Sequence, residues 1–323
     1  MIMRRQLSLL ALLVLADCSV GPDFQRPTAP AAAGYSPEPL TIGTTSHPAS
    51  GAQRFVSGRD IPGDWWTLFH SPALNALVQR ALEANPTLEA AQASLRQAQE
   101  NKLAQVGAFF PTLQASFGAQ RNKIATGSLA SPSSKALAYY NLYTGQVSVG
   151  FAPDVFGLNR RTVESLDAVA QNQRYQLEAV YLTLTANVAA AAVQEALLRA
   201  QIEATNKIIS FERQSVQLLQ KQFGLGSVAR QDVLTQQAAL TAAEATLPPL
   251  ERSLAQQRDL LAALVGQLPS APPSETFELA SLQLPSDLPV SLPSRLVEQR
   301  PDILAAEETL RSANANIGVA VAN

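Results

Sequence analysis

A very long stretch without proline or glycine constrains this sequence most. It runs from Arg160 to Phe223, which at ~1.5 Å per residue corresponds to roughly 95 Å of uninterrupted helix. Helices of globular proteins rarely exceed ~25 residues, so a helix of this length indicates a coiled coil or a similar array. Mostly apolar residues recur within it at spacings of three and four, as in a packing seam: Leu166, Ala170, Gln173, Leu177, Val180, Leu184, Val188 and Ala191.

A glycine-containing turn separates this helix from a second one. In the turn Gly224-Leu225-Gly226-Ser227, the glycines permit positive φ, and Ser227 is predicted to cap the returning helix. Asp232 then lies near the start of that helix, where a negative charge is favoured. The prolines Pro248-Pro249 predict an interruption before a further helical segment to about residue 265.

Two shorter segments show a different periodicity. From residue 112 to 120 and from 142 to 151, apolar residues alternate with polar or small ones. Period two predicts strands with one apolar and one polar face. Each run has about ten residues, the length of a transmembrane β-strand. On the alternation alone, a hairpin half-buried in a soluble core is favoured over a membrane hairpin.

The N-terminus has the features of an export signal. Arg4 and Arg5 precede an apolar run from Leu7 to Leu15, which is shorter than the ~20 residues of a membrane span. The lone cysteine, Cys18, cannot form an internal disulfide. The residues before it resemble a bacterial lipobox, which predicts cleavage and lipidation at Cys18. A buried N-terminal helix and a non-lipidated cysteine are the alternatives.

Composition excludes several function classes. A net charge of −2 gives no electrostatic basis for nucleic-acid binding. His47 and His70 have no cysteine or carboxylate at a ligand spacing, so no standard zinc site is expected. We find no nucleophile elbow, phosphate loop or catalytic carboxylate pair, and we therefore expect no enzyme, no metal and no cofactor.

The Arg160-Arg161 pair is expected either to face lipid headgroups or to form a solvated helix start.

An internal repeat relates the C-terminal residues to an earlier segment of the chain. Residues from Arg300-Pro301 onward match those from Asn85-Pro86 onward, with eight identities in 24 aligned residues. The second copy therefore predicts another helix of the same kind. Together, these signals predict a division of the chain into a signal peptide, a lipid-anchored extended tether, two helices, a strand pair, a long helical hairpin, a linker and a second repeat. The corresponding ranges are 1–17, 18–63, 64–108, 109–157, 158–268, 269–299 and 300–323.

Taken together, these motifs resemble the outer membrane factor (TolC-like) family of tripartite efflux systems, in its lipoprotein (NodT-type) branch. The segment Arg300-Pro301-Asp302-Ile303, within the block from Leu292-Pro293 to Gly318, is the most specific. The other matching residues are Cys18-Ser19-Val20-Gly21-Pro22 with Pro27, Trp65-Trp66 with Phe69, Asn85-Pro86, Phe109-Phe110-Pro111, Phe156-Gly157, and Gly224-Leu225-Gly226 with Asp232-Val233-Leu234.

The resemblance implies a mainly α-helical fold with a membrane β-hairpin. It also implies a homotrimer in the outer membrane, in which each subunit gives four strands to a shared twelve-stranded barrel and the long helical hairpins form a periplasmic tunnel. The helices within residues 64–108 would then be equatorial and upper tunnel helices. The tip residues Gly224, Leu225, Gly226, Ser227 and Asp232 would then contact a periplasmic adaptor, which links to an inner-membrane pump. Drugs or other small molecules would leave passively through the bore.

The resemblance also changes the interpretation of the strands, because a barrel wall needs an apolar face toward lipid. The residues expected to face lipid are Leu113, Phe117, Tyr143, Val147, Val149 and Phe151. The matched residues cover about the first two thirds of a typical family member, with two strands and one complete hairpin. The chain is therefore expected to be C-terminally truncated and not to form a conducting channel alone.

Two other interpretations remain open at this point. Adaptors also carry helical hairpins, so a periplasmic coiled-coil or adaptor-like structural lipoprotein is one alternative. Adaptors usually flank the hairpin with β-rich modules, and the residues after 266 show no series of strand signals. A non-functional truncated fragment is the other alternative.

Overall fold

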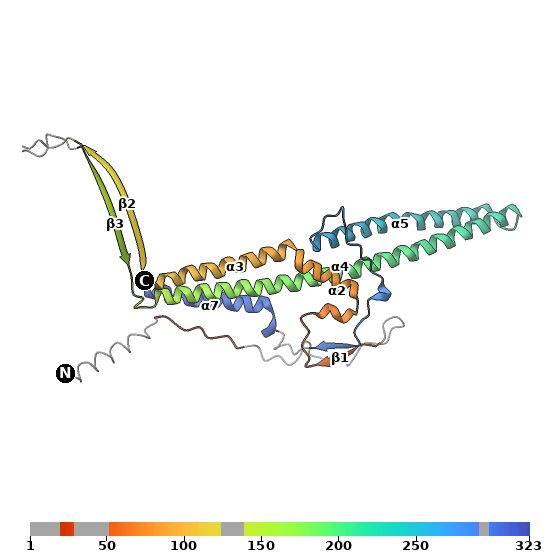
Figure 1. The fold of residues 1–323 in the computed structure, drawn as a ribbon. Coiled ribbons are helices and arrows are strands. Elements are labelled where there is room, and N and C mark those ends of the chain that lie inside the picture. Colours follow the sequence, from red (N-terminus) through yellow and green to blue (C-terminus); the bar gives the residue numbers. More distant parts are fainter. Residues whose placement is uncertain (1–19, 29–51, 124–138, 291–296) are drawn as a thin grey trace, which may run out of the picture. The chain divides into compact units, whose positions relative to one another are not determined.

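The computed structural model describes residues 20–28, 52–123, 139–290 and 297–323. These residues form two compact units, described separately below: residues up to 25 with 97–170 and 308–323, and residues 26–96 with 171–307. The mainly helical fold with a strand pair agrees with the predicted fold class (Figure 1). The helices are α2 (Pro72–Ala84), α3 (Pro86–Val106), α4 (Leu158–Gly224), α5 (Arg230–Leu264) and α7 (Pro301–Ala322), and the strands are β1 (Arg54–Ser57), β2 (Thr112–Lys123), β3 (Tyr139–Gly150) and β4 (Asp287–Val290).

Helix α4 confirms the prediction of one long uninterrupted helix, with 67 residues. At its start, the Asp154 carboxylate accepts hydrogen bonds from the backbone N–H groups of Asn159 and Arg160, both at 3.0 Å. These bonds satisfy two donors that a helix N-terminus leaves without intrahelical partners. By length and composition, α4 could cross a membrane, because one 18-residue window has a mean hydropathy of 1.2, with 33% of it buried. An alanine-rich helix in a protein core can have the same length and hydropathy.

Helix α5 returns alongside α4 without the predicted interruption (Figure 1). Pro248 and Pro249 lie inside this continuous helix, so the expectation of two separate segments was wrong. A proline fixes φ near the helical value, but it removes the hydrogen bond of its own N–H and its ring crowds the carbonyl of the preceding turn. Contacts to α4 flank this position, including an ion pair of 2.7 Å between Arg213 and Glu244. The long-range contacts thus offset the local proline signal.

The core of the second unit lies where α2, α4 and α5 meet. Its side chains are apolar and mostly small on α4, which allows the helices to approach closely. The most buried are Leu74, Leu77 and Val78 of α2, Val188 and Ala192 of α4, and Leu261 and Val265 of α5. Phe277, in the segment after α5, is 1% exposed and completes this core. The predicted linker 269–299 is therefore partly an element of the core.

Two short strands in this unit were not predicted. Strand β1 pairs in parallel with β4, in the register Arg54↔Asp287 to Ser57↔Val290. An ion pair of 3.1 Å between Arg54 and Asp287 lies at one end of the pair. Neither the extended tether predicted at 18–63 nor the linker predicted at 269–299 was expected to contain a strand. Four residues are too few to show a periodicity, and the partner strand is distant in the sequence.

Asn85 connects two helix ends in the same unit. Its carboxamide oxygen accepts hydrogen bonds from the N–H groups of Thr87 (2.9 Å) and Leu88 (3.3 Å), which caps α3. Its Nδ2 donates to the carbonyl of Leu264 at the end of α5, at 2.9 Å. The neighbouring Gly266 has φ 69°, and a Cβ there would lie 2.2 Å from the carbonyl oxygen of Ala84. The backbones at these two helix ends therefore approach closely.

The predicted repeat corresponds to equivalent helices in the structure. Helix α3 begins at Pro86 and α7 begins at Pro301, the two aligned prolines, and the helices have 21 and 22 residues. Proline suits the first helical position because its missing N–H would have no intrahelical partner. The residue before the proline differs: Asn85 caps α3, whereas Arg300 forms an ion pair of 2.7 Å with Asp302.

Candidate functional site

The first candidate site is the antiparallel hairpin formed by β2 and β3, which confirms both predicted strands (Figure 1). The register pairs Leu113 with Val149 and Ala115 with Val147. Because side chains on directly paired positions point to the same side, the apolar residues of both strands share one face. The rings of Phe117 and Tyr143 stack on this face with centroids 6.5 Å apart.

This apolar face is exposed along the hairpin. The exposed fraction is 75% for Phe117, 71% for Val147 and 73% for Leu113. Contiguous exposed apolar surface of this kind marks a contact with lipid or with another protein. Of the residues predicted to face lipid, Leu113, Phe117, Tyr143, Val147 and Val149 lie within the strands, and Phe151 follows the end of β3. The structure brings these side chains together, and their contact with lipid stays a prediction.

A pair of cations lies at the other end of this hairpin, away from Phe151. The guanidinium of Arg121 lies 5.7 Å and the Lys123 ammonium 5.4 Å from the centroid of the Tyr139 ring. Cation–π contacts stabilise this arrangement. An aromatic ring with basic side chains is typical of a membrane–water interface. The residues that connect β2 to β3, 124–138, lie outside the described residues.

The second candidate site is the turn between α4 and α5. The N–H of Ser227 donates to the carbonyl of Gln222 and the N–H of Gly226 donates to that of Phe223, both at 2.9 Å. With Gly226 at φ 76°, this is a Schellman motif. The predicted turn is confirmed, but only Gly226 uses positive φ, since Gly224 is the last residue of α4. The tip presents Leu225 with 83% of its surface exposed.

The start of α5 differs from the predicted one. Ala229, not Ser227, is the N-cap residue. Asp232 accepts a hydrogen bond from the backbone N–H of Ala229 at 3.0 Å, and its charge lies in the first helical turn. This contact supports the helix-start role of Asp232. Its contact with a partner, like that of the tip residues, stays a prediction.

The third candidate site is the junction between the β-hairpin and α4, where the structure corrects the expectation for Arg161. The side chain of Arg161 is 6% exposed, so it neither faces headgroups nor forms a solvated helix start. Hydrogen bonds to the carboxylates of Glu164 and Asp23 raise the pKa of the guanidinium above its ordinary value. Arg160, in contrast, lies 3.5 Å from Asp154 and is partly exposed.

The hydrogen-bonding roles of Arg161 and Asn85 were not predicted from the sequence, and Glu195 was not singled out at all. Glu195 is completely buried, and its carboxylate accepts hydrogen bonds from Arg199 Nε at 2.9 Å and from the Phe277 N–H at 3.1 Å. Its position on the packing seam of α4 could have been inferred from the helical spacing. Its hydrogen bond with Phe277, a residue distant in the sequence, could not have been inferred in this way. Cys18, the predicted lipidation site, lies outside the described residues, as does His47.

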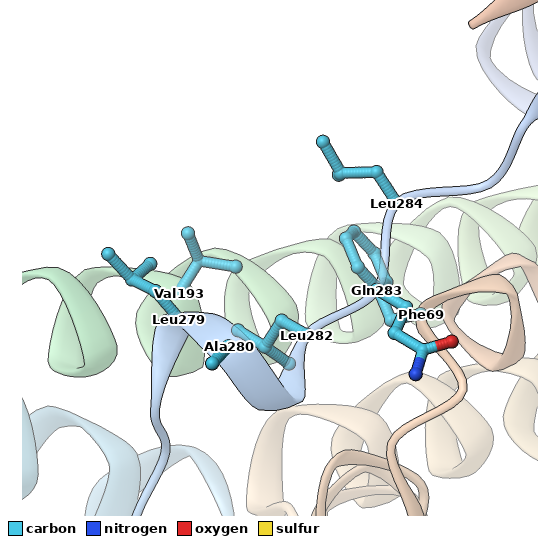
Figure 2. A pocket seen from close by; sticks show the side chains of 7 residues that line it. All are labelled: Phe69, Val193, Leu279, Ala280, Leu282, Gln283 and Leu284. Atoms are coloured by element: carbon cyan, nitrogen blue, oxygen red, sulfur yellow. The ribbon is translucent and has the colours of Figure 1, made fainter. Parts of the chain in front are cut away.

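A groove in the second unit shows no set of groups suited to catalysis (Figure 2). It has a volume of about 470 Å³ and is lined by Phe69, Val193, Leu279, Ala280, Leu282, Gln283 and Leu284. Apart from the Gln283 amide, these side chains are apolar. Within the described ranges, no three His, Cys, Asp or Glu side chains are grouped so that they could hold a metal ion.

A family comparison agrees with this geometry. The family model "Outer membrane efflux protein" matches residues 77–267, which is more than half of the chain. The match includes α3, the β-hairpin, α4 and α5. It therefore covers the elements that carry the first two candidate sites.

Curated relatives are similar over nearly the whole chain. The "Probable efflux pump outer membrane protein TtgC" of Pseudomonas putida is 29% identical over 307 residues, which cover 95% of this chain and 61% of that protein. "Nodulation protein T" of Rhizobium leguminosarum bv. trifolii is 25% identical over 316 residues, covering 96% of this chain and 62% of that protein. The chain thus spans less than two thirds of the length of these relatives.

Solved structures show the same fold. The outer-membrane channel OprN is 28% identical with a TM-score of 0.77, and the match covers 94% of this chain and 64% of that one. The outer membrane channel CmeC of Campylobacter jejuni has a TM-score of 0.75 at 20% identity, over 94% of this chain and 62% of that one. At the identity of CmeC, the likeness concerns the fold alone.

Proposed function

Because the chain belongs to the outer membrane efflux protein family, we propose that it is a subunit of an outer-membrane channel that forms the exit duct of a tripartite efflux system. Small molecules such as drugs leave passively through this duct. The observation that carries the proposal is the exposed apolar face of the β2–β3 hairpin in a chain that also has a 67-residue helix. This combination serves a protein that is in the outer membrane and extends into the periplasm.

The hairpin supplies the membrane part of this subunit. Its apolar face meets lipid, and the opposite face, with Gln114, Ser116 and Gln146, meets water in the bore. In the described part of the chain, β2 and β3 pair only with each other, so each has one unpaired edge. A bilayer does not tolerate unpaired strand edges. The edges are therefore completed by further strands, including those of neighbouring subunits in a homotrimer.

The helical hairpin supplies the periplasmic part. Leu225 at the tip exposes an apolar surface that a periplasmic adaptor would cover, and Gly226 keeps the turn tight enough to present it. The adaptor connects the duct to an inner-membrane pump, which provides the energy. A lipid on Cys18 adds a second attachment to the outer membrane. The adaptor-like lipoprotein alternative does not account for an exposed apolar β-hairpin.

Deletion of the gene in its host tests the proposal. Accumulation of a fluorescent pump substrate inside the cells should rise, and a plasmid copy should reverse the rise. The plasmid-borne variant Val147→Arg should fail to do so, because a charge on the lipid-facing side of a strand costs about 2–4 kcal/mol near the bilayer centre. The protein should also be lost from the outer-membrane fraction.

Ser148→Arg is the matched control, since Ser148 is the next residue and lies on the opposite face of β3. This variant should remain in the outer membrane and restore export. Unchanged accumulation after deletion, tested with substrates of several pumps, would contradict the efflux function. Normal outer-membrane amounts of the Val147→Arg variant would show that the apolar face does not contact lipid.

A further inference from the structure

The buried guanidinium of Arg161 binds the segment that begins two residues after Cys18. Its Nε donates to the carbonyl of Val20 at 3.1 Å, and its Nη2 donates to the carbonyl of Gly21 at 3.2 Å and to Asp23 Oδ1 at 2.9 Å. Its Nη1 donates to Glu164 Oε2 at 2.7 Å. The planar fork of arginine can serve acceptors in several directions at once, which a lysine ammonium does less well. Arg161 thus recognises the main chain of this segment at a fixed register.

The segment also fits sterically between α4 and α7. Gly21 has φ 101°, and a Cβ there would lie 2.5 Å from the Cα of Gly318 in α7. A Cβ on Gly318 would in turn lie 2.8 Å from Cγ of Arg161. Both positions therefore exclude a side chain, and the Arg161 stem occupies the space that Gly318 leaves. Such close backbone approach is a role specific to glycine.

Two further hydrogen bonds hold the same segment. Asn314 Nδ2 of α7 donates to the carbonyl of Pro22 at 2.9 Å, and the N–H of Val20 donates to the carbonyl of Phe156 at 3.4 Å. Phe156 lies in the connection between β3 and α4. Three separate parts of the first unit, namely α4, α7 and this connection, therefore bind Val20–Asp23. A flexible tether would not require such a site.

We propose that Arg161 is the docking residue for the N-terminal segment and fixes the lipid anchor beside the base of the membrane hairpin. The inference rests on the proposed lipidation of Cys18. Two residues of chain span at most about 7 Å, so a lipid on Cys18 would be attached within that reach of Val20. A single acyl chain binds a membrane only marginally and needs a second signal. Docking couples the lipid to the β-hairpin, so that both attachments act at one place on the membrane.

Distance measurements between two spin labels test the docking. The labels are attached to Gln25→Cys and Val169→Cys, which are exposed residues of the first unit. The acylated full chain is measured in lipid nanodiscs, and a second sample carries Cys18→Ser so that no native thiol reacts. We expect a narrow distance distribution in both samples. Arg161→Met should broaden it at least twofold.

Two further variants separate docking from general loss of structure. Gly21→Ala leaves Arg161 and the helices intact but places a Cβ against Gly318, and it should broaden the distribution as Arg161→Met does. Lys102→Met removes an ion pair of 2.7 Å with Asp167 in the same unit and should leave the distribution narrow. Equal widths for the Arg161→Met variant and the unmodified sequence, or a broad distribution in the latter, would overturn the docking.

The intact mass of the purified protein distinguishes failure of the docking from failure of the lipidation. A narrow distribution together with an acylated Cys18 supports the whole inference. A narrow distribution without acylation would overturn the role in anchoring, because no lipid would be held, and it would also contradict the lipidation proposed above. An acylated protein with a broad distribution would overturn the role of Arg161 and leave the lipidation supported.

Discussion

Replacement of Asn85 should destabilise the chain by an amount that can be divided between two hydrogen-bonding roles. Asn85 is 8% exposed, its oxygen caps α3, and its Nδ2 donates to the carbonyl of Leu264 at 2.9 Å. Asn85→Ala removes both interactions. Asn85→Ser retains a capping oxygen of similar quality but is too short to reach Leu264.

The expected magnitudes follow from these contacts. Loss of an N-cap costs about 1 kcal/mol, and loss of the hydrogen bond to a poorly accessible carbonyl costs about 1 kcal/mol more. We therefore expect the free energy of unfolding to fall by about 2 kcal/mol for Asn85→Ala and by about 1 kcal/mol for Asn85→Ser. The difference between the two variants measures the cap alone.

Urea-induced unfolding of the full chain in detergent micelles, followed by circular dichroism, gives these free energies. Gln79→Ala is the control, since the Gln79 amide donates a hydrogen bond to Glu83 on an exposed part of α2. This variant should change the free energy of unfolding by no more than about 0.5 kcal/mol. Equal losses for Asn85→Ala and Asn85→Ser would refute the capping role. A loss below about 0.5 kcal/mol for Asn85→Ala would refute the reasoning as a whole.

Two other predictions concern the tip and the acid stability of the second unit. Gly226→Ala should destabilise the α4–α5 hairpin by about 1–2 kcal/mol in the same unfolding assay, because an L-residue is strained at positive φ, whereas Gly224→Ala should be nearly neutral. For Glu275, burial raises the pKa, but the Arg80 guanidinium 2.6 Å away outweighs it and the net pKa is lowered. The ionised Glu275 carboxylate therefore stabilises the fold fully above about pH 4.3, the ordinary pKa of a glutamate in the unfolded chain. This stabilisation is lost as pH falls through the lowered pKa of the folded state. Glu275→Gln should flatten the loss of stability at acid pH, and an unchanged slope between pH 5 and 3 would argue against the ion pair.

Local patterns in the sequence predicted the elements that carry the proposed function. Residues 112–120 and 142–151 alternate with period two, and all of them except Phe151 lie in β2 or β3, because a pleated strand directs successive side chains to opposite faces. The glycine turn after Phe223 was predicted for a similar reason, since positive φ at a helix end favours glycine. Ser227 was predicted to cap α5, but Ala229 is the N-cap residue, which shows that helix ends are less well predicted than helix bodies.

Contacts between residues distant in the sequence account for the features that were missed. Strand β1 forms because β4 lies beside it, and neither tetrapeptide has a periodic signal of its own. Helix α5 continues through Pro248 and Pro249 because its packing on α4 outweighs a local proline preference. In both cases the segment that stabilises the element lies far away in the sequence, so the neighbouring residues alone do not predict the element.

The sequence by itself determined the long helix, the amphipathic strands and the repeat, because each follows from spacing along the chain, and its motifs, such as Arg300-Pro301-Asp302-Ile303, carried the resemblance to the family. The tertiary structure alone decided which polar side chains are buried and what they bind. Arg161 was one basic residue in a pair until the fold placed Val20, Gly21 and Asp23 around its guanidinium. Hydrogen bonding depends on distances in space of about 3 Å, and the order of residues in a chain does not specify such distances between remote segments.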